Sequence, residues 1–364
     1  MKKAFFVNGG AGRVLCSIPA LERHAETNDD FVIVSESWSE LFMLNPTLRD
    51  KVYPVTHKDL FEDKLKDKKI VSTEPYRVNQ YFNQKCNLIQ AFDIEINELD
   101  EIPESRPINI ELTKEEQISG YNIVTEVKTT LKKDKTVVFQ PFGSAVKIEG
   151  KFIVDSSGRS FELSNTFDII KNLNKHFSVI VMSDIDIPGL DELGVSFPRS
   201  IPLNVWAGII NASDYFLGCD SVGQHLAHAL KKPATVVIGS TYPENISYPD
   251  NKDFKIIDLG KNKRKYSPIR IGYAPATDRN NESLMMIDND RQIKRITDSV
   301  VMKIGKSTNK PNLMGESKYD PINPMDPGAQ PIGEYKGFAG MNRKKTKEKK
   351  TVVDEVLELN NVEN

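Results

Sequence analysis

The segment between residues 203 and 245 alternates helical and extended patterns, and it restricts the possible folds more than any other part of the chain. The apolar runs at 214–218 and 234–238 are predicted strands, and residues 222–230 between them have the apolar periodicity of a helix. Strand–helix–strand units of this length form parallel sheets. Polar residues follow both strands, at the carboxyl edge where open α/β sheets bind ligands. We therefore predict a doubly wound α/β fold with a ligand site at this edge.

The same alternation runs through most of the chain. Further strands are predicted at 4–7, 31–34, 52–55, 70–72, 137–140, 179–182 and 255–258, with helices at 14–26, 114–131 and 289–303. A charged run at 131–136 follows one of these helices and indicates a connection between two Rossmann-like domains. We place the first domain at 1–133 and the second at 134–304.

The chain changes character beyond residue 305. Five prolines between 311 and 331 lie among Gly, Asn and Ser without apolar periodicity, which predicts a mostly disordered tail over 305–364. The run at 343–350 is strongly basic, and apolar residues at 352–359 recur with the spacing of a short amphipathic helix. Because such a helix suits docking in an apolar groove, the tail is a candidate tether to a protein partner.

Composition limits the class of protein. No run of about 18 apolar residues occurs, so no membrane span is predicted, and the apolar stretch of four residues near the start is too short for a signal peptide. The three cysteines, Cys16, Cys86 and Cys219, form no Cys-x-x-Cys motif, which favours a reducing cytoplasm without disulfides or zinc. A net charge of −2 provides no overall basic footprint for nucleic acid. We expect a soluble cytoplasmic protein.

A glycine-rich loop at 8–13 separates the first predicted strand from the first predicted helix. Gly10-x-Gly12 is two-thirds of a dinucleotide-binding motif, but Leu15 stands where a third Gly or Ala is needed for the helix to pack on the strand. Glu36, after the second strand, is placed to bind a ribose. The alternatives are a tight turn without a ligand and a loop that lines a substrate cleft.

Three groups of residues form motifs along the chain. The longest is Asp220-Ser221, His225-Leu226-Ala227, Ala229-Leu230, Pro233 and Gly239-Ser240-Thr241. The second is Gly12, Val14-Leu15 and Pro19-Ala20-Leu21, and the third is Gln140-Pro-Phe-Gly-Ser144. Together, over roughly residues 5 to 300, they resemble the motifs of the heptosyltransferase-like glycosyltransferase family 9.

The resemblance implies a GT-B fold, in which two Rossmann-like domains with parallel sheets face each other. It also implies inverting transfer of a sugar from an ADP-heptose-like nucleotide sugar to a glycan such as lipopolysaccharide core, with no metal or other cofactor. The donor-binding residues it implies are Gly143, Ser144, Lys147, Asp220, Ser221, Val222, Gly223, His225, Ser240 and Thr241, with Arg159 as an alternative cation to Lys147. On the acceptor side, Gly10 and Gly12 line the cleft, and Arg77 lies just past the fourth predicted strand.

Two simpler interpretations apply to the longest motif. Asp220 and Ser221 are preferred helix N-cap residues, although capping is compatible with phosphate binding at the same helix start. His225 and His228 lie three apart on one predicted helix, but no third ligand follows them, so a zinc site is not predicted. We expect His225 near the donor diphosphate, and His228 in packing or at the surface.

Arg13 departs from the family pattern. The resemblance implies an Asp here as general base on the acceptor hydroxyl, and an Arg cannot accept a proton at neutral pH. Three accounts are open: a base elsewhere, with Glu74, His24 and Glu36 as candidates; an anionic acceptor bound by Arg13; or a nucleotide- or glycan-binding module that has lost activity. A modified DNA base is an alternative acceptor, because the basic run in the tail would be attracted to phosphate.

Overall fold

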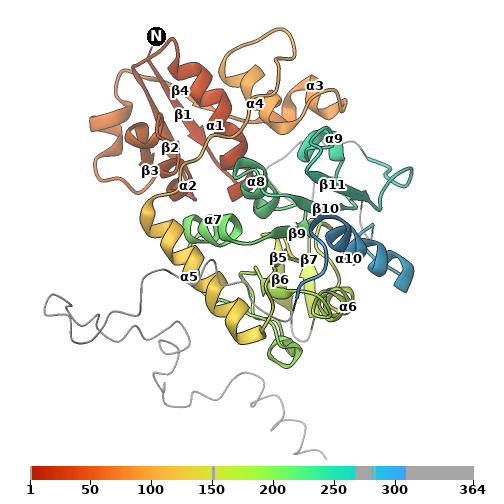
Figure 1. Cartoon of the computed structure of the whole chain (residues 1–364). Coiled ribbons are helices and arrows are strands. Elements are labelled where there is room, and N and C mark those ends of the chain that lie inside the picture. Colours follow the sequence, from red (N-terminus) through yellow and green to blue (C-terminus); the bar gives the residue numbers. More distant parts are fainter. Residues whose placement is uncertain (1, 150–151, 267–280, 282–283, 309–364) are drawn as a thin grey trace, which may run out of the picture. The chain divides into compact units, whose positions relative to one another are not determined.

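The computed structural model describes residues 2–149, 152–266, 281 and 284–308. Within these residues, two parallel sheets form the framework (Figure 1). The smaller has the order β3-β2-β1-β4, with β1 at Lys3–Val7, β2 at Phe31–Ser35, β3 at Val52–Pro54 and β4 at Lys69–Ser72. The larger has the order β11-β10-β9-β5-β8, with β5 at Thr136–Gln140, β8 at Ser178–Val181, β9 at Tyr215–Cys219, β10 at Ala234–Ile238 and β11 at Phe254–Asp258.

Every strand that the sequence predicts is present, and each predicted end lies within one residue of the observed end. The reason is burial: β2, β5, β8, β9 and β10 are buried at every position, as expected for parallel strands covered on both faces. The predicted doubly wound α/β class is therefore confirmed.

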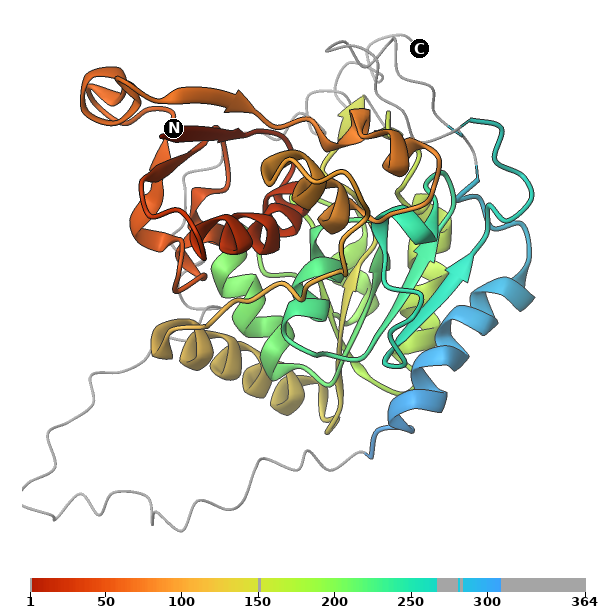
Figure 2. The ribbon, with the colours of Figure 1, turned by 90° about the horizontal axis from the view of Figure 1, so that it is seen from above.

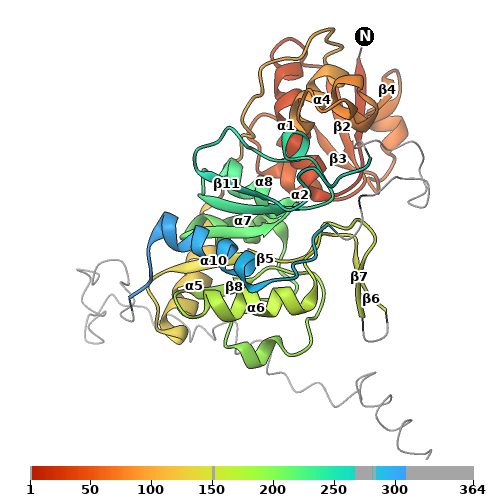
Figure 3. The ribbon, with the colours of Figure 1, turned by 90° about the vertical axis from the view of Figure 1, so that its right-hand side faces the viewer.

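An additional hairpin was not predicted. Strands β6 at Val146–Glu149 and β7 at Phe152–Asp155 pair antiparallel and project away from the larger sheet (Figure 3). The first strand, VKIE, alternates apolar and polar residues, whereas the second, FIVD, begins with three apolar residues. It lies between the motif at Gln140–Ser144 and Arg159, so it determines the path of the chain beside the candidate site.

Helices connect the strands and cover the sheets. They are α1 at Ala11–Ala25, α2 at Ser39–Met43, α3 at Asn79–Phe82, α4 at Leu88–Ile96, α5 at Lys114–Leu131, α6 at Leu163–Leu173, α7 at Leu203–Ala212, α8 at Val222–Ala229, α9 at Pro243–Ile246 and α10 at Asp290–Ile304. Short helical turns lie at η1 Arg49–Lys51, η2 Phe61–Leu65, η3 Pro75–Arg77 and η4 Leu190–Leu193. The helix predicted at 114–131 is observed with those limits, whereas α4 and α6 were not predicted.

Helix α1 begins earlier than predicted, and this changes the position of Arg13. The carbonyl of Gly10 accepts hydrogen bonds from the backbone N–H groups of Arg13 and Val14, so the first turn starts at Ala11. The predicted loop at 8–13 is therefore too long. Arg13 lies in the first helical turn and is buried.

One apolar core joins the helices of the two sheets. Phe5 and Leu15 from the first part of the chain belong to the same cluster as Trp206 and Phe216 from the second. A second cluster fills the opposite face of the larger sheet, where α6 and α10 pack together (Figures 2 and 3). The first cluster contains residues from both predicted domains, so it marks no boundary between them. The domain limits 1–133 and 134–304 stay predictions.

Helices α5 and α7 cross at two glycines (Figure 1). A Cβ atom added to Gly208 would lie 2.1 Å from the carbonyl oxygen of Glu116, and one added to Gly120 would lie 2.1 Å from the carbonyl carbon of Gly208. Asn204 fixes the same crossing by donating a hydrogen bond of 2.9 Å to the Glu116 carboxylate. Only the missing side chains of these two glycines permit this approach, which offsets the usual cost of glycine in a helix interior.

The tail predicted at 305–364 lies outside the described residues from residue 309 onward. The basic run at 343–350 and the predicted amphipathic helix at 352–359 fall in that part. Within the described residues, no helix is long and apolar enough to cross a membrane.

Candidate active site

A cavity of about 510 Å³ lies at the carboxyl ends of strands from both sheets. This volume is in the range of sites for nucleotide-sized ligands. The cavity brings together these residues of the predicted site: Gly10, Gly12, Arg13, Glu74, Arg77, Gly143, Ser144, Asp220, Ser221, Val222, His225, Ser240 and Thr241. The predicted residues His24, Glu36, Lys147 and Gly223 are not among those that line it.

His24 is a core residue instead of a cavity residue. Its ring packs edge-on against Phe5 and Phe31, with centroid distances of 4.9 and 5.1 Å. Its Nδ1 lies 3.2 Å from the side-chain oxygen of Asn97. Burial lowers the pKa of His24. The strand-end position suggested by the sequence therefore does not expose this imidazole to a substrate.

The other three residues are displaced by local structure. Glu36 is exposed just after β2, and Lys147 is exposed on the unpredicted hairpin strand β6. The backbone N–H of Gly223 is occupied, because it donates a 2.9 Å hydrogen bond to the side-chain oxygen of Gln140. Gln140 also donates to the Ser221 hydroxyl at 3.2 Å. Thus Gln140, and not Asp220 or Ser221, satisfies the start of α8.

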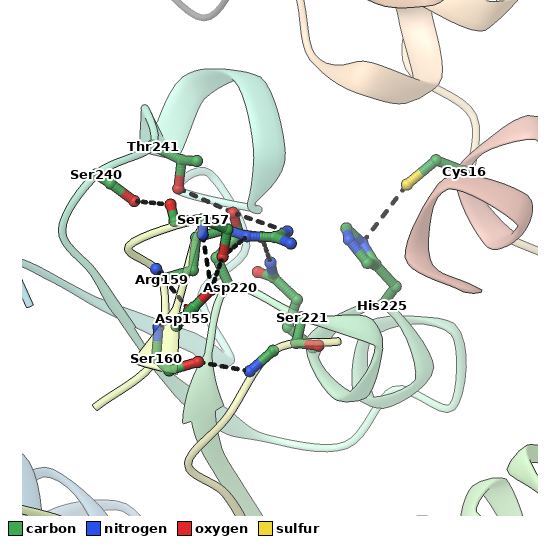
Figure 4. Close-up of polar contacts among 12 residues, drawn as sticks. Cys16, Asp155, Ser157, Arg159, Ser160, Asp220, Ser221, His225, Ser240 and Thr241 are labelled. Atoms are coloured by element: carbon green, nitrogen blue, oxygen red, sulfur yellow. Dashed lines mark hydrogen bonds and ion pairs between the residues drawn. The ribbon is translucent and has the colours of Figure 1, made fainter. Parts of the chain in front are cut away.

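A loop after β7 presents Arg159 to the cavity (Figure 4). The Asp155 carboxylate accepts hydrogen bonds from the backbone N–H groups of Ser157, Arg159 and Ser160, at 2.7, 3.0 and 2.8 Å. Burial raises the pKa of Asp155, but hydrogen bonds from Ser157 and Ser160 outweigh it and leave the pKa below its usual value. The Ser160 hydroxyl in turn accepts from the backbone of Gly143 at 2.9 Å. The loop is held in place before any ligand arrives.

Asp220 connects this loop to the segment after β10. It accepts hydrogen bonds of 2.8 Å from Gln224 and from the Thr241 hydroxyl, and it lies 3.9 Å from the Arg159 guanidinium (Figure 4). Burial raises the pKa of Asp220, while Arg159 and the two hydrogen bonds lower it in part. Asp220 therefore orients a cation and a hydroxyl at the cavity wall.

Arg13 and Glu74 form an ion pair that also lines the cavity. One guanidinium nitrogen lies 3.2 Å from the Glu74 carboxylate, and the other donates to the carbonyl of Thr73. The guanidinium also lies 5.3 Å from the centroid of the Tyr76 ring. The Arg13 side chain is 7% exposed and that of Glu74 is 26% exposed. Of the three carboxylate or imidazole candidates for the general base, Glu74 is the one that lines the cavity.

Trp38 also lines the cavity and was missed by the sequence analysis. Its backbone adopts the left-handed conformation, with φ 64° and ψ 29°, immediately before α2. Such a conformation is unfavourable for a bulky residue, and strained residues of this kind concentrate at ligand sites. The available signal was its place a few residues beyond a predicted strand.

His228 packs against Tyr248, whose hydroxyl contacts the cavity residue His225. Its ring stacks on that of Tyr248 at a centroid distance of 3.5 Å, and burial lowers the pKa of His228 to about 4. Its Nδ1 is buried and has no hydrogen-bond partner among the described residues. The folded protein therefore favours neutral His228.

This burial predicts a pH dependence of stability. The unfolded histidine titrates near its ordinary value of about 6.5, so the unfolded chain binds more protons between pH 6.5 and 4. Folding stability from His228 should be complete above pH 6.5 and should fall by about 1.4 kcal/mol per pH unit below it. Denaturant melts at several pH values, compared with the His228→Phe variant, measure this. A wild-type slope equal to that of the variant would contradict neutral burial.

Comparisons with known proteins identify the fold. No protein-family model matches the sequence, and no curated protein matches it significantly. Among solved structures, the family 9 glycosyltransferase of Veillonella parvula has a TM-score of 0.56 at 12% identity, covering 83% of this chain and 97% of that one. The ADP-heptose lipopolysaccharide heptosyltransferase II of E. coli has a TM-score of 0.52 at 11% identity, covering 71% and 90%. The E. coli heptosyltransferase TibC, solved with ADP-D-β-D-heptose, has a TM-score of 0.51 at 12% identity, covering 83% and 75%.

The chain therefore has the GT-B fold. More particularly, its fold is that of the heptosyltransferase-like family 9 glycosyltransferases, so the resemblance predicted from the motifs is confirmed at the level of fold. TibC is described as iron-containing. Among the described residues of this chain, no group of three or more His, Cys, Asp or Glu side chains is close enough to hold a metal ion. Metal-independent transfer stays a prediction.

Proposed function

We propose that the protein is a glycosyltransferase that moves a sugar from a nucleoside-diphosphate sugar to a glycan hydroxyl. The observation that carries this proposal is one cavity lined by a half-buried cation, Arg159, and by a carboxylate, Glu74. Arg159 comes from the loop after the hairpin β6–β7, and Glu74 follows β4 of the smaller sheet. A leaving group that gains negative charge and an acceptor that loses a proton need these two groups on opposite sides of the sugar.

On the donor side, Arg159 would neutralise the diphosphate. Its guanidinium is held by the Ser157 hydroxyl at 3.1 Å and by Asp220 at 3.9 Å. The hydroxyls of Ser240 and Thr241 lie on the same wall. A positioned cation stabilises a departing diphosphate without the cost of reorganisation.

On the acceptor side, Glu74 would act as the general base and Arg13 as its positioning residue. The Glu74 carboxylate takes the proton of the acceptor hydroxyl, and the freed oxygen bonds to the anomeric carbon as the bond to the diphosphate breaks. Attack from the face opposite the leaving group inverts the anomeric centre. Arg13 replaces the family's Asp in sequence, and the ion pair brings a carboxylate to the same cavity from a different element.

The donor and acceptor proposed for the first tests come from the neighbours. ADP-heptose is named for heptosyltransferase II, and ADP-D-β-D-heptose is named for the TibC complex. Lipopolysaccharide is named for heptosyltransferase II. We propose a nucleotide sugar of this class and a lipopolysaccharide-type glycan, acting in the cytoplasm. A DNA acceptor rested on the basic run at 343–350, which lies outside the described residues, and nothing in the cavity favours it.

Donor binding tests the assignment of Arg159. Arg159→Ala should weaken ADP binding by about tenfold or more, since a charge-assisted hydrogen bond contributes about 1.5–3 kcal/mol. The matched control is Lys147→Ala, which removes an exposed cation of the hairpin and should leave the affinity unchanged. Calorimetry measures the ADP affinity of both variants. Equal affinities of wild type and a folded Arg159→Ala variant would refute the assignment.

A further inference from the structure

His225 lies where the two parts of the fold meet at the floor of the cavity. Its Nδ1 is 2.7 Å from the Tyr248 hydroxyl and 3.5 Å from the Cys16 sulfur, which belongs to α1 (Figure 4 shows the Cys16 contact). The imidazole is 5% exposed and lines the cavity. The two polar groups beside the ring, the Tyr248 hydroxyl and the Cys16 sulfur, therefore both lie at Nδ1.

The opposite edge of the ring faces Gly12 and the cavity. A Cβ atom added to Gly12 would lie 2.8 Å from Cδ2 and 3.2 Å from Nε2 of His225. Nε2 has no hydrogen bond to any described residue. Gly12 thus leaves room beside a ring nitrogen that is open to a ligand.

Among His225, Tyr248 and Cys16, one assignment of hydrogen-bond donors and acceptors is more favourable than the other. A neutral imidazole nitrogen is a strong acceptor and a thiol sulfur is a weak one. If Nδ1 carried the proton and donated to the Tyr248 oxygen, the phenol would have the Cys16 sulfur as its remaining acceptor here. If Tyr248 donates to Nδ1, the phenol proton has the strong acceptor, and the Cys16 thiol can donate to the phenol oxygen.

The protonation states agree with this order. Burial lowers the pKa of His225 to about 3, so the ring is neutral at physiological pH and carries one N–H. Burial also raises the pKa of Tyr248 far above its usual value, with smaller contributions from the neighbouring Cys16 and Asp220, so the phenol keeps its proton. A neutral imidazole whose Nδ1 accepts a hydrogen bond carries its proton on Nε2.

We propose that Tyr248 and Cys16 are positioning residues that hold His225 as its Nε2–H tautomer, with this N–H directed into the cavity as a donor to a phosphate oxygen of the ligand. The tautomer is a property of the free protein, while the phosphate as its acceptor rests on the proposed function. Tyr248 is the stronger of the two because its oxygen is at hydrogen-bond distance and its ring is fixed by stacking on His228.

Nitrogen NMR of the full-length protein with ¹⁵N-labelled histidine tests the tautomer directly. We expect the His225 signal, assigned with the His225→Gln variant, to show the Nε2–H pattern. Tyr248→Phe keeps the ring that stacks on His228 and should produce a mixture of the two tautomers. The matched control is Tyr242→Phe, which removes a hydroxyl that bonds the Tyr266 carbonyl in the same region and should leave the His225 signal unchanged. An Nδ1–H pattern in the wild type, or no change in Tyr248→Phe, would overturn the proposal.

Calorimetry with ADP tests the use of this N–H. Tyr248→Phe should weaken ADP binding about three- to tenfold. His225→Asn, which lacks an N–H at the Nε2 position, should lose more affinity than His225→Gln, which can place an amide N–H near it. Equal losses in the two variants would remove the phosphate contact. If wild type shows the Nε2–H pattern but does not bind ADP, the proposed function fails while the tautomer assignment stands.

Discussion

Glu74→Gln is expected to lower the rate of sugar transfer by about a hundredfold to ten-thousandfold, because a positioned general base contributes a factor of this size. The amide retains an oxygen that can accept the hydrogen bond from Arg13, which lies 3.2 Å from the carboxylate, so the fold and the ion-pair geometry are disturbed little. Donor affinity should be unchanged, since Glu74 is proposed to act on the acceptor and not on the donor. Single-turnover kinetics and calorimetry on the same variant separate the two quantities.

Two further variants make this test specific. Glu36→Gln removes an exposed carboxylate that does not line the cavity, and it should leave the rate unchanged. Arg13→Asp would restore the family's residue but place a second carboxylate beside Glu74, and we expect it to slow the reaction. A rate increase in Arg13→Asp, together with an undiminished rate in Glu74→Gln, would show that Glu74 is not the base and that the wild type lacks a base at position 13.

Gly208→Ala is expected to destabilise the protein by about 3 kcal/mol or more, although alanine is normally preferred to glycine in a helix by about 1 kcal/mol. The new Cβ would lie 2.1 Å from the Glu116 carbonyl oxygen, a backbone atom that no rotamer change can move. Helices α5 and α7 would have to separate. Denaturant melts followed by circular dichroism measure the change.

The control for this prediction is on the partner helix. Ile118 of α5 is 59% exposed, so Ile118→Ala should change the free energy of unfolding by less than about 0.5 kcal/mol. If Gly208→Ala proved as stable as Ile118→Ala, the close crossing of the two helices would be wrong.

The sequence predicted the strands well because each is a short apolar run buried on both faces. Residues 234–238, for example, are apolar except for Thr235 and are buried throughout. The hairpin β6–β7 was missed although its first strand, VKIE, alternates apolar and polar residues. Its omission misplaced Lys147, which was expected at the donor phosphates and is exposed on β6.

The candidate site was predictable where residues lie at strand ends, and less so where packing decides. Asp220, Ser221 and Thr241 follow buried strands, and parallel topology brings such ends together. His24 could not be excluded from sequence, because its burial depends on contacts with Phe5 and Phe31 from two different strands. The pairing of Arg13 with Glu74 likewise depends on a contact 61 residues apart.

The central claim is transfer of a sugar from a nucleoside diphosphate, and one measurement tests it most directly. The full-length protein is incubated with ADP-, GDP- and UDP-sugars, including ADP-heptose, together with lipopolysaccharide of truncated core. Nucleoside diphosphate release and acceptor mass are then followed. We predict that one donor is consumed, that the acceptor gains one sugar for each diphosphate released, and that Arg159→Ala slows both by about tenfold or more. Donor binding without release of diphosphate would indicate a binding module, and the absence of both binding and release across the panel would contradict the account.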